Sequence, residues 1–280
     1  MSQRVVLITG CSAGGLGHAL AKAFREQGLR IIATARDPTK IDPSLQNDDQ
    51  IDILPLDVTD AQSIDACVQR VQKITNGRLD VLVNNAGGAI FGPLVHASVA
   101  EGKALYDVNV WGLLAIAQGF TPLLIQSKGV ILNICSMAGA VPLAWQGIYN
   151  SSKAAATFVS ETLRLELAPL NVRVVTAMVG AVGTQIYTKH NMTLPKDSYY
   201  KPIEEYIAKQ ASGELQEPNN EDINVTARNI VRDTLRGRRG KIWRGGEAGA
   251  AKYGSWLLPT WLVEWILHQG RGLFQLKYTA

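Results

Sequence analysis

Cysteine is scarce in this chain, which has only Cys11, Cys67 and Cys135 among its 280 residues. An odd number of widely separated thiols does not make a disulfide framework, and none of the spacings is that of a metal site. We therefore expect free thiols, a reducing compartment and no bound metal.

Neither positive nor negative side chains are in large excess. Lys and Arg number 28 against 24 Asp and Glu, a net charge of +4, and the basic residues are mostly scattered, with no aromatic–basic recognition pattern. We therefore expect no nucleic-acid partner, whereas a mildly basic chain suits small anionic ligands. A hydrophobic content of 46% with 19% charged residues is ordinary for a soluble globular chain with a sizeable core.

Long apolar runs and a leader segment are also missing. No apolar run reaches the roughly 20 residues that span a bilayer. Residues 1–4 lead straight into a strand-like segment, so we expect no signal peptide before the fold. Together with the cysteines, this predicts an intracellular protein, either cytoplasmic or peripherally associated with endoplasmic-reticulum or lipid-droplet membrane.

A strand followed by a glycine-rich turn opens the chain. Residues 4–9 (RVVLIT) are a β-branched apolar run typical of a strand buried on both faces. Gly10, Gly15 and Gly17 follow, just before the helical pattern HALAKAFREQG. A glycine cluster alone usually marks a loop, but between a strand and a helix it predicts a dinucleotide site. Gly10 allows the tight turn, and the other two let a pyrophosphate approach the positive end of the helix.

The end of the second predicted strand bears on the choice of cofactor. Sites selective for NAD(H) commonly carry an acidic residue there, which binds the ribose 2′-hydroxyl. The strand LRIIATAR ends instead in Ala35 and Arg36, and Arg36 can pair with a 2′-phosphate. Lys40 is a candidate second cation. Asp37 keeps NAD(H) open, and a solvated arginine is the plainer alternative, but we predict NADP(H).

The rest of the chain alternates strands and helices. Further strands are predicted at 51–56, 80–87, 129–136, 172–179 and 241–246. Helices are predicted at 61–75, 101–127 and 221–237, and a further helix, which carries Tyr149 and Lys153, runs to about residue 168 and stops at Pro169. No linker, repeat or low-complexity tract interrupts this α/β pattern. It predicts one domain over residues 1–280, built on a single doubly wound parallel β-sheet with helices on both faces.

A serine, a tyrosine and a lysine are the candidate catalytic residues. Tyr149 and Lys153 are four apart in a predicted helix, so both side chains emerge on one face. An ammonium beside a phenol favours the phenolate and makes the phenol a usable general acid or base. Ser136 ends the fifth strand, where open α/β sheets place their ligands. By itself the pair could be a surface contact, and Asn109 in the long helix could be a core polar group satisfied by backbone.

Two segments fall outside the alternation. Residues 185–220 are polar, rich in proline and tyrosine, and leave directly from the sixth strand, so we predict a helical substrate lid rather than a variable surface excursion. Residues 247–280 form an apolar C-terminal extension, which we expect to pack on its own domain or on a twin subunit; lying on a membrane is the alternative. Its predicted apolar helical face carries Leu258, Trp261, Leu262 and Trp265.

Taken together, these motifs resemble those of the short-chain dehydrogenase/reductase family. They lie in the family's order over roughly the first two-thirds of the chain: TGCSAGGLG (9–17), Asp57, NNAG (84–87), Asn109, Ser136, Tyr149 with Lys153, and VGAVGT (179–184). The TGCS turn, the ATAR strand end, LPKDSYYKPIEE in the insert and the aromatic tail resemble the fungal NADPH-dependent 1-acyldihydroxyacetone phosphate reductases. The resemblance implies a Rossmann fold and a small-molecule ketone or alcohol substrate, and we expect a homo-oligomer.

The resemblance also implies a role for each residue. Tyr149 would give a proton to the carbonyl oxygen as hydride arrives, Ser136 would orient that oxygen, and Lys153 would assist Tyr149 and hold the nicotinamide ribose. Asn109 would hold a water that relays protons to Lys153. The implied cofactor contacts are Gly10, Ser12, Leu16 and Gly17 for pyrophosphate and ribose, Asp57 and Asn85 for the adenine side, and Val182 and Thr184 for the nicotinamide carboxamide.

Three positions depart from the family pattern. The glycine turn has one extra residue, so Gly14 and Gly15 both remain candidates for the phosphate contact. Val179 stands where a proline is usual, which we expect to loosen the turn into the insert. Cys135 precedes Ser136 where a second serine is frequent, and a small polarisable side chain should be tolerated there.

These observations predict an NADPH-dependent ketone reductase. Its substrate is either a lipophilic or phosphorylated ketone such as 1-acyldihydroxyacetone phosphate, with Lys189 or Lys196 as phosphate contacts, or a polyketide, terpenoid or alkaloid ketone of fungal secondary metabolism. A sensor or scaffold that binds NADPH without turnover is a third alternative, which the intact catalytic residues disfavour.

Overall fold

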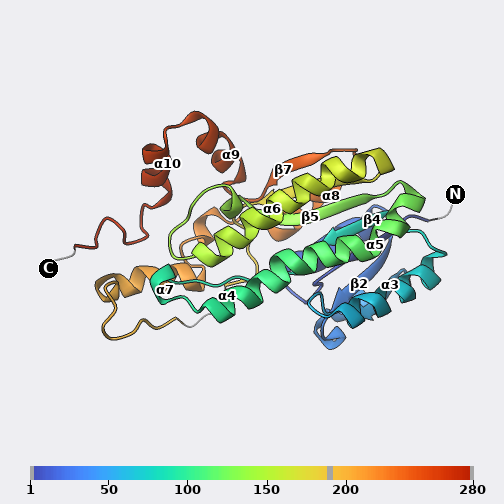
Figure 1. Cartoon of the computed structure of the whole chain (residues 1–280), viewed down its shortest axis with the longest axis horizontal. Coiled ribbons are helices and arrows are strands. Elements are labelled where there is room, and N and C mark those ends of the chain that lie inside the picture. The colour runs from blue at the N-terminus through green and yellow to red at the C-terminus, as the bar shows by residue number, and fades with distance from the viewer. Residues whose placement is uncertain (1–2, 188–191, 278–280) are drawn as a thin grey trace.

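Short runs of β-branched and aliphatic residues build one sheet (Figure 1). The computed structural model describes residues 3–187 and 192–277, and within them seven strands pair in the order β3-β2-β1-β4-β5-β6-β7, all parallel. The strands are β1 (Val5–Ile8), β2 (Arg30–Ala35), β3 (Ile51–Pro55), β4 (Val81–Asn84), β5 (Val130–Ser136), β6 (Arg173–Val179) and β7 (Gly240–Arg244). Because β4 lies beside β1, the winding reverses there. The predicted doubly wound parallel sheet is confirmed.

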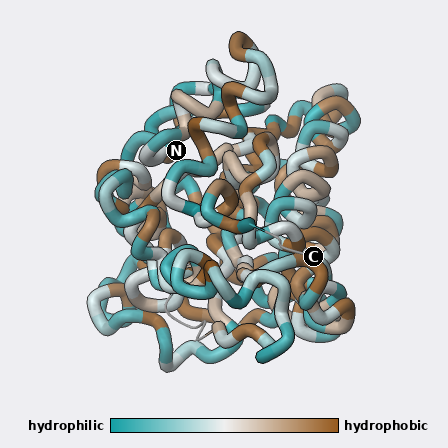
Figure 2. The backbone as a smooth tube through the Cα atoms, turned by 90° about the vertical axis from the view of Figure 1, so that its left-hand side faces the viewer, coloured by the Kyte–Doolittle hydropathy of each residue, from teal (hydrophilic) through white to brown (hydrophobic). Residues whose placement is uncertain are grey.

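Helices cover both faces of this sheet (Figure 1). α1 (Leu16–Glu26) and α8 (Ile223–Leu235) pack side by side on one face, and α3 (Ala61–Thr75), α5 (Leu113–Ser127) and α6 (Gly147–Leu167) cover the other. Hydrophobic and hydrophilic positions alternate along the helical turns in Figure 2, as expected for helices with one buried face. The shorter helices are α2 (Pro43–Gln46), α4 (Val99–Tyr106), α7 (Glu204–Ser212), α9 (Ala248–Leu257) and α10 (Thr260–Leu267).

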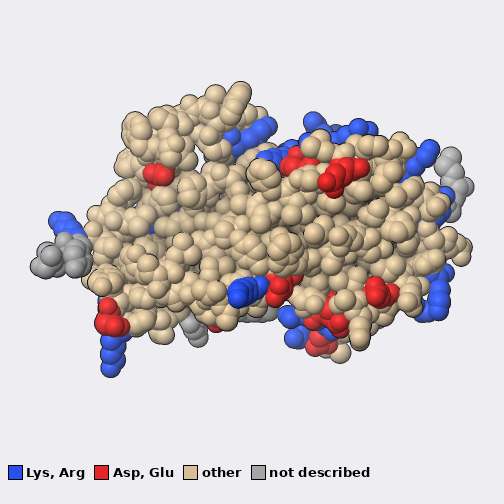
Figure 3. All heavy atoms as spheres, in the orientation of Figure 1, with Lys and Arg blue, Asp and Glu red and all other residues tan. Residues whose placement is uncertain are grey.

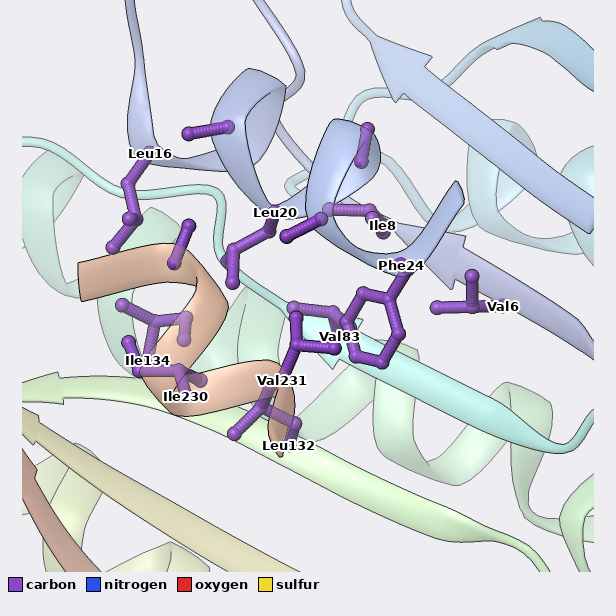
Figure 4. Packing of buried hydrophobic residues seen from close by; sticks show 14 of the residues in the cluster. Val6, Ile8, Leu16, Leu20, Phe24, Val83, Leu132, Ile134, Ile230 and Val231 are labelled. Carbon is purple, nitrogen blue, oxygen red and sulfur yellow. The ribbon is translucent and has the colours of Figure 1, made fainter. Parts of the chain in front are cut away.

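The packing of α1 fixes the start of that helix relative to the sheet (Figure 4). Leu16, Leu20 and Phe24 recur every four residues, so one face of α1 is apolar and meets the strands. Ile230 and Val231 of α8 complete the cluster, in which Phe24 is fully buried. The first turn of α1 is thereby held at the carboxyl end of β1.

The predicted helix at 101–127 is one helical stretch with a change in winding. α4 continues into a π-helical segment, Asp107–Gly112, and then into α5. By length and apolar content the stretch Val99–Ser127 could cross a membrane, so the expectation that no segment is long enough is wrong on those two criteria. However, 50% of its apolar window is buried inside the protein, where α5 packs on α3 and β4. A core helix of a soluble domain has the same composition.

The described part of the insert has a small core of its own. α7 follows a 3₁₀ turn, and Ile203 and Ile207 are buried together with Trp145 and Leu194. Lys189 lies outside the described residues. The insert therefore packs on the loop that precedes α6, the helix of Tyr149.

The C-terminal extension differs from its prediction. Pro259 separates α9 from α10, so the four apolar residues do not share one helix. Trp261 is 68% exposed and Trp265 53%, so they do not pack on their own domain, and Figure 1 shows both helices standing away from the sheet. The chain then turns back: the buried His268 accepts the Ala144 N–H at Nε2, at 3.2 Å.

The three cysteines are free and buried. Burial raises the pKa of Cys11 to about 12 and that of Cys67 to about 11, so both thiols are poor nucleophiles at neutral pH.

Candidate active site

A cleft of about 470 Å³ opens past the carboxyl ends of β1, β2, β5 and β6. Open α/β sheets bind ligands at this edge, near the reversal of winding. Most of the site residues named from the sequence border it, namely Gly10, Ser12, Gly15, Leu16, Arg36, Asp57, Asn85, Ser136, Tyr149, Lys153, Val182 and Thr184. Gly17 and Asn109 do not.

The glycine turn presents backbone amides to the cleft. Gly15 is the N-cap of α1, no side chain caps this helix, and its first turn has no acidic residue. The first-turn N–H groups therefore keep their positive partial charge for an anion. Gly14, with φ +71°, faces the Gln185 side chain instead. Of the two glycines left open by the sequence, Gly15 is the one at the cleft.

Gly17 and Asn85 hold this turn in shape. A Cβ at Gly17 would lie 2.4 Å from the Gly10 carbonyl oxygen and 2.5 Å from Asn85 Nδ2. The Asn85 amide donates to the carbonyl oxygens of Thr9 at 2.9 Å and Gly10 at 3.0 Å. Gly17 is therefore needed for close contact between α1 and the turn, and its predicted part in the approach of the pyrophosphate stays a prediction.

Arg36 and Lys40 make the cleft cationic beyond the end of β2. The carboxylate of Asp37 accepts from the Thr39 hydroxyl at 2.6 Å and the Thr39 amide at 3.1 Å. These bonds, aided by the charge of Lys40, lower the pKa of Asp37. Asp37, the acidic residue that kept NAD(H) as an alternative cofactor, is thus hydrogen-bonded within its own loop. Arg36 can then bind a ligand phosphate.

Ser136, Tyr149 and Lys153 border the same cleft. The buried Lys153 Nζ donates to the Ile134 carbonyl oxygen at 3.0 Å. Ser136 Oγ accepts the Ala138 N–H at 3.2 Å and donates to the Val179 carbonyl oxygen at 3.3 Å. The half-buried Tyr149 ring packs against a cluster around Met137 and Leu143. A phenol, an ammonium and a hydroxyl therefore face one enclosed volume.

Asn109 lies behind these residues rather than in the cleft. Its carboxamide oxygen accepts the Gly88 N–H at 2.9 Å, and its NH₂ donates to the Gly88 carbonyl oxygen and to Ser152 Oγ, each at 3.0 Å. Both amide hydrogens are used, so Asn109 joins the loop after β4 to α6. A water on the way to Lys153 would have to be held by an oxygen of Asn109, and this relay role stays a prediction.

Backbone hydrogen bonds hold the turn that follows Val179. The Gly180 N–H donates to the Arg244 carbonyl oxygen at 2.9 Å and the Ala181 N–H to that of Gly246 at 2.8 Å. The turn is thereby tied to the end of β7, and a loosening by the missing proline stays a prediction.

Several cleft residues were missed from the sequence. Tyr187 and Gln216 lie in the insert, whose polarity was the only signal that could have indicated them. Gln146 precedes α6, and Arg271 follows α10. No local pattern singles out these two, because only the tertiary fold brings them to the cleft.

A family model described as short chain dehydrogenase matches residues 4–194, more than half of the chain. The chain belongs to the short-chain dehydrogenase family. Two fungal relatives align over most of both chains: short-chain dehydrogenase cctT of Talaromyces islandicus, 45% identical over 92% of this chain and 90% of its own, and ptmH of Penicillium ochrochloron, 43% identical over 98% and 100%. The NADPH-dependent 1-acyldihydroxyacetone phosphate reductase of Schizosaccharomyces pombe is 39% identical over 74% and 71%.

Solved structures show the same fold. A short-chain dehydrogenase from Streptomyces avermitilis superimposes with a TM-score of 0.78 at 27% identity and covers 98% of each chain. A metagenomic short-chain oxidoreductase in complex with NADP superimposes with a TM-score of 0.59 at 33% identity, over 66% of this chain and 83% of its own. This dehydrogenase is therefore an oxidoreductase of the predicted class.

The cleft residues fit the predicted cofactor, NADP(H). The uncapped first turn of α1 suits a pyrophosphate, and Arg36 with Lys40 suits a 2′-phosphate. Lys153 and Thr184 also border the cleft, and the family resemblance assigns both to the nicotinamide half.

Replacing Arg36 by alanine should weaken NADPH binding about 10-fold and leave NADH binding nearly unchanged, because a charge-assisted hydrogen bond contributes about 1.5 kcal/mol or more. Fluorescence titration with each cofactor measures both dissociation constants. Arg25→Ala is the control, since Arg25 pairs with Asp48 at 2.8 Å away from the cleft. Equal losses for the two cofactors would contradict the assignment of Arg36.

Proposed function

We propose that this dehydrogenase is an NADPH-dependent ketoreductase that tailors a lipophilic ketone of secondary metabolism. The observation that carries the activity is the placement of Ser136, Tyr149 and Lys153 on one cleft of a short-chain dehydrogenase fold. The fungal relatives cctT and ptmH support this pathway type, since their similarity extends over nearly the whole chain. Apolar residues such as Leu143 and Ile186 border the cleft and suit a lipophilic substrate.

Bound NADPH supplies the hydride that reduces the carbonyl carbon. The protein handles the negative charge that develops on the carbonyl oxygen. Ser136 Oγ is held by the Ala138 amide, and its hydrogen can turn from the Val179 carbonyl oxygen to the substrate oxygen. Donors preset toward a developing charge in a water-poor site are commonly the largest single contribution to catalysis.

Tyr149 donates the proton to the same oxygen. Lys153 cannot swing away, since its Nζ is tied to the Ile134 carbonyl oxygen at 3.0 Å and its side chain is buried. A fixed positive charge one helical turn from the phenol stabilises the phenolate that proton transfer leaves. The geometry therefore supports a concerted supply of hydride and proton to one C=O group.

Tyr149→Phe should retain NADPH affinity and lose about 100-fold or more in kcat, the usual contribution of a general acid. Loss of NADPH absorbance against a ketone panel measures turnover, and fluorescence titration measures binding. Tyr253→Phe, at a tyrosine that is 56% exposed in α9, is the matched control. A near-native rate in the Tyr149 variant would exclude this residue as the proton donor.

A second candidate substrate is 1-acyldihydroxyacetone phosphate. It is favoured by the 39% identity to a reductase of that name, although the similarity covers only 74% of the chain. Lys196, one of the cations suggested for its phosphate, is exposed and does not border the cleft. The broader similarity to cctT and ptmH favours the first proposal.

We also propose that the α5–α6 face pairs with a second copy of the chain. Figure 3 shows few charged side chains over the middle of this face, whereas charges gather near its margins. Phe158 is 81% exposed and Leu165, seven residues on, 63% exposed. Both lie on α6, at a spacing that puts them on one side of the helix. A second copy would bury them.

Phe158→Glu should convert the oligomer to monomers, because a carboxylate would have to be buried without a partner. Light scattering after size-exclusion chromatography measures the mass. Val225→Glu, at an exposed position of α8 on the opposite face, should leave the mass unchanged. A monomeric wild-type protein would refute the proposed interface.

For the extension we propose contact with a membrane surface, in keeping with a peripheral intracellular location. Trp256 is 81% exposed and Trp261 68%, and the exposed charges of residues 248–277 are Lys252 and Lys277 against Glu264. Exposed tryptophans on short helices with a basic excess are typical of interfacial segments.

Trp256→Ser with Trp261→Ser should weaken binding to anionic vesicles about 100-fold or more, since burying each large apolar side chain contributes about 1.5–3 kcal/mol. Co-sedimentation with vesicles of mixed anionic and neutral phospholipid measures binding. Trp111→Ser removes a tryptophan that is 57% exposed outside the extension and is the control. Wild-type protein that stays wholly in the supernatant would rule out the contact.

A further inference from the structure

An arginine of the C-terminal extension reaches the catalytic cleft. Arg271 follows α10 and borders the same cleft as Ser136 and Tyr149. The Trp145 indole N–H donates to the carbonyl oxygen of Arg271 at 2.7 Å. The backbone N–H of Arg271 donates to the carbonyl oxygen of His268 at 3.2 Å. The backbone of Arg271 is therefore anchored, and its side chain is directed by the fold rather than by solvent.

Hydrogen bonds orient the guanidinium. Nε donates to the Leu267 carbonyl oxygen at 2.7 Å, and Nη1 donates to Gln210 Oε1. Arginine has only donors, so Gln210 must turn its oxygen toward it and its NH₂ away. The NH₂ of Gln210 then donates to Gln146 Oε1 at 3.0 Å, and the NH₂ of Gln146 to Asn150 Oδ1 at 3.0 Å. The result is a directed chain of amides from Arg271 to the first turn of α6.

This cation has no close counter-charge among residues 3–187 and 192–277, where none of the ion pairs within 4.0 Å involves Arg271. Burial is the largest influence on its pKa and lowers it, against the opposing effects of Tyr187 and Glu247. Only two of its N–H groups have partners in the described chain. A cation held this way gains stability from an anionic ligand.

Two neighbours place this cation at the substrate end. Tyr187 borders the cleft together with Tyr149 and Arg271, and its pKa responds to the charges of both. Gln216 borders the cleft and donates to Gln210 Oε1 at 2.8 Å, while its own Oε1 is buried with no hydrogen-bond partner among the described residues. The N–H groups of Arg271 that have no partner in the described chain are donors that an anionic substituent of the substrate would use.

We propose that Arg271 determines substrate specificity by binding an oxyanion, a carboxylate or a phosphate, on the ketone that Tyr149 protonates. The inference rests on the proposed ketoreductase function and narrows its substrate to acidic ketones. The planar guanidinium forms two parallel hydrogen bonds to such groups. Arg271 therefore has the role suggested from the sequence for Lys189 or Lys196, which is to bind the anionic group of the substrate.

The test compares matched substrates with and without the anion. The kcat and KM of NADPH-dependent reduction are measured for aryl keto acids and their methyl esters, with wild type, Arg271→Gln and Arg271→Lys. Wild type should favour the acid about 10-fold or more in kcat/KM, the usual effect of a charged hydrogen bond. The glutamine variant should lose this preference through a higher KM for the acid, so that its acid-to-ester ratio falls toward one. The lysine variant should keep part of the preference.

A second substrate pair identifies the oxyanion. An acyl ketone phosphate and its dephosphorylated form are measured in the same way, and the pair with the larger ratio in wild type names the group that Arg271 binds. Lys277→Gln removes another cation of the extension, exposed and outside the cleft, and should leave both ratios unchanged.

The outcomes that would overturn this proposal differ from the one that would refute the proposed function. An acid-to-ester ratio that is the same in wild type and Arg271→Gln overturns the proposal, and so does an equal loss on acid and ester, which would indicate a purely structural role. If Arg271→Gln does not fold, the ratio in Arg271→Lys carries the test, because lysine keeps the charge but not the paired donors. Failure of wild type to oxidise NADPH with any ketone would instead refute the proposed function.

Discussion

The hydrogen bond from Lys153 Nζ to the Ile134 carbonyl oxygen, 3.0 Å long, joins the catalytic helix to the sheet two residues before Ser136. This hydrogen bond fixes the position of α6 along β5, and therefore the position of Tyr149 relative to Ser136. Lys153 is only 6% exposed. If its buried ammonium lost this acceptor, the stability of the folded protein would fall by several kcal/mol. The charge that assists the phenol therefore also holds the phenol in place.

Neutral amides hold the surroundings of this bond. Asn109 joins Gly88 to Ser152, the residue next to Lys153, while Asn84 donates to Asn133 Oδ1 at 2.9 Å and Asn133 to Ser160 at 2.8 Å. These bonds tie β4, β5 and α6 together behind the cleft. A carboxamide offers donors and acceptors without a net charge, so it braces the site without competing electrostatically with the ammonium of Lys153.

The sequence predicted what depends on local pattern. β-branched runs between glycine turns and amphipathic helices indicated the strands and their parallel order, and residues at strand ends, such as Ser136 and Arg36, were indicated because parallel strands deliver their carboxyl ends to one edge. It did not predict how a side chain is used once the fold is made. The close contact of Gly17 with Gly10 and the hydrogen bonds of Asn109 to Gly88 and Ser152 were not foreseen, since close packing and hydrogen-bond saturation are tertiary properties. Arg271 was missed because its neighbours in sequence are unrelated to its neighbours in space.

The placement of Arg271 links substrate recognition to the proton donor. The directed chain of amides begins at its guanidinium and ends at Asn150, whose NH₂ donates to the Leu143 carbonyl oxygen at 2.7 Å and which directly follows Tyr149. Reversing any one amide would set two donors or two acceptors against each other, so the chain has a single favourable state. A residue of the C-terminal extension thus shares one hydrogen-bond network with the first turn of the catalytic helix. The arginine sets the direction of that network, because a guanidinium has only donors.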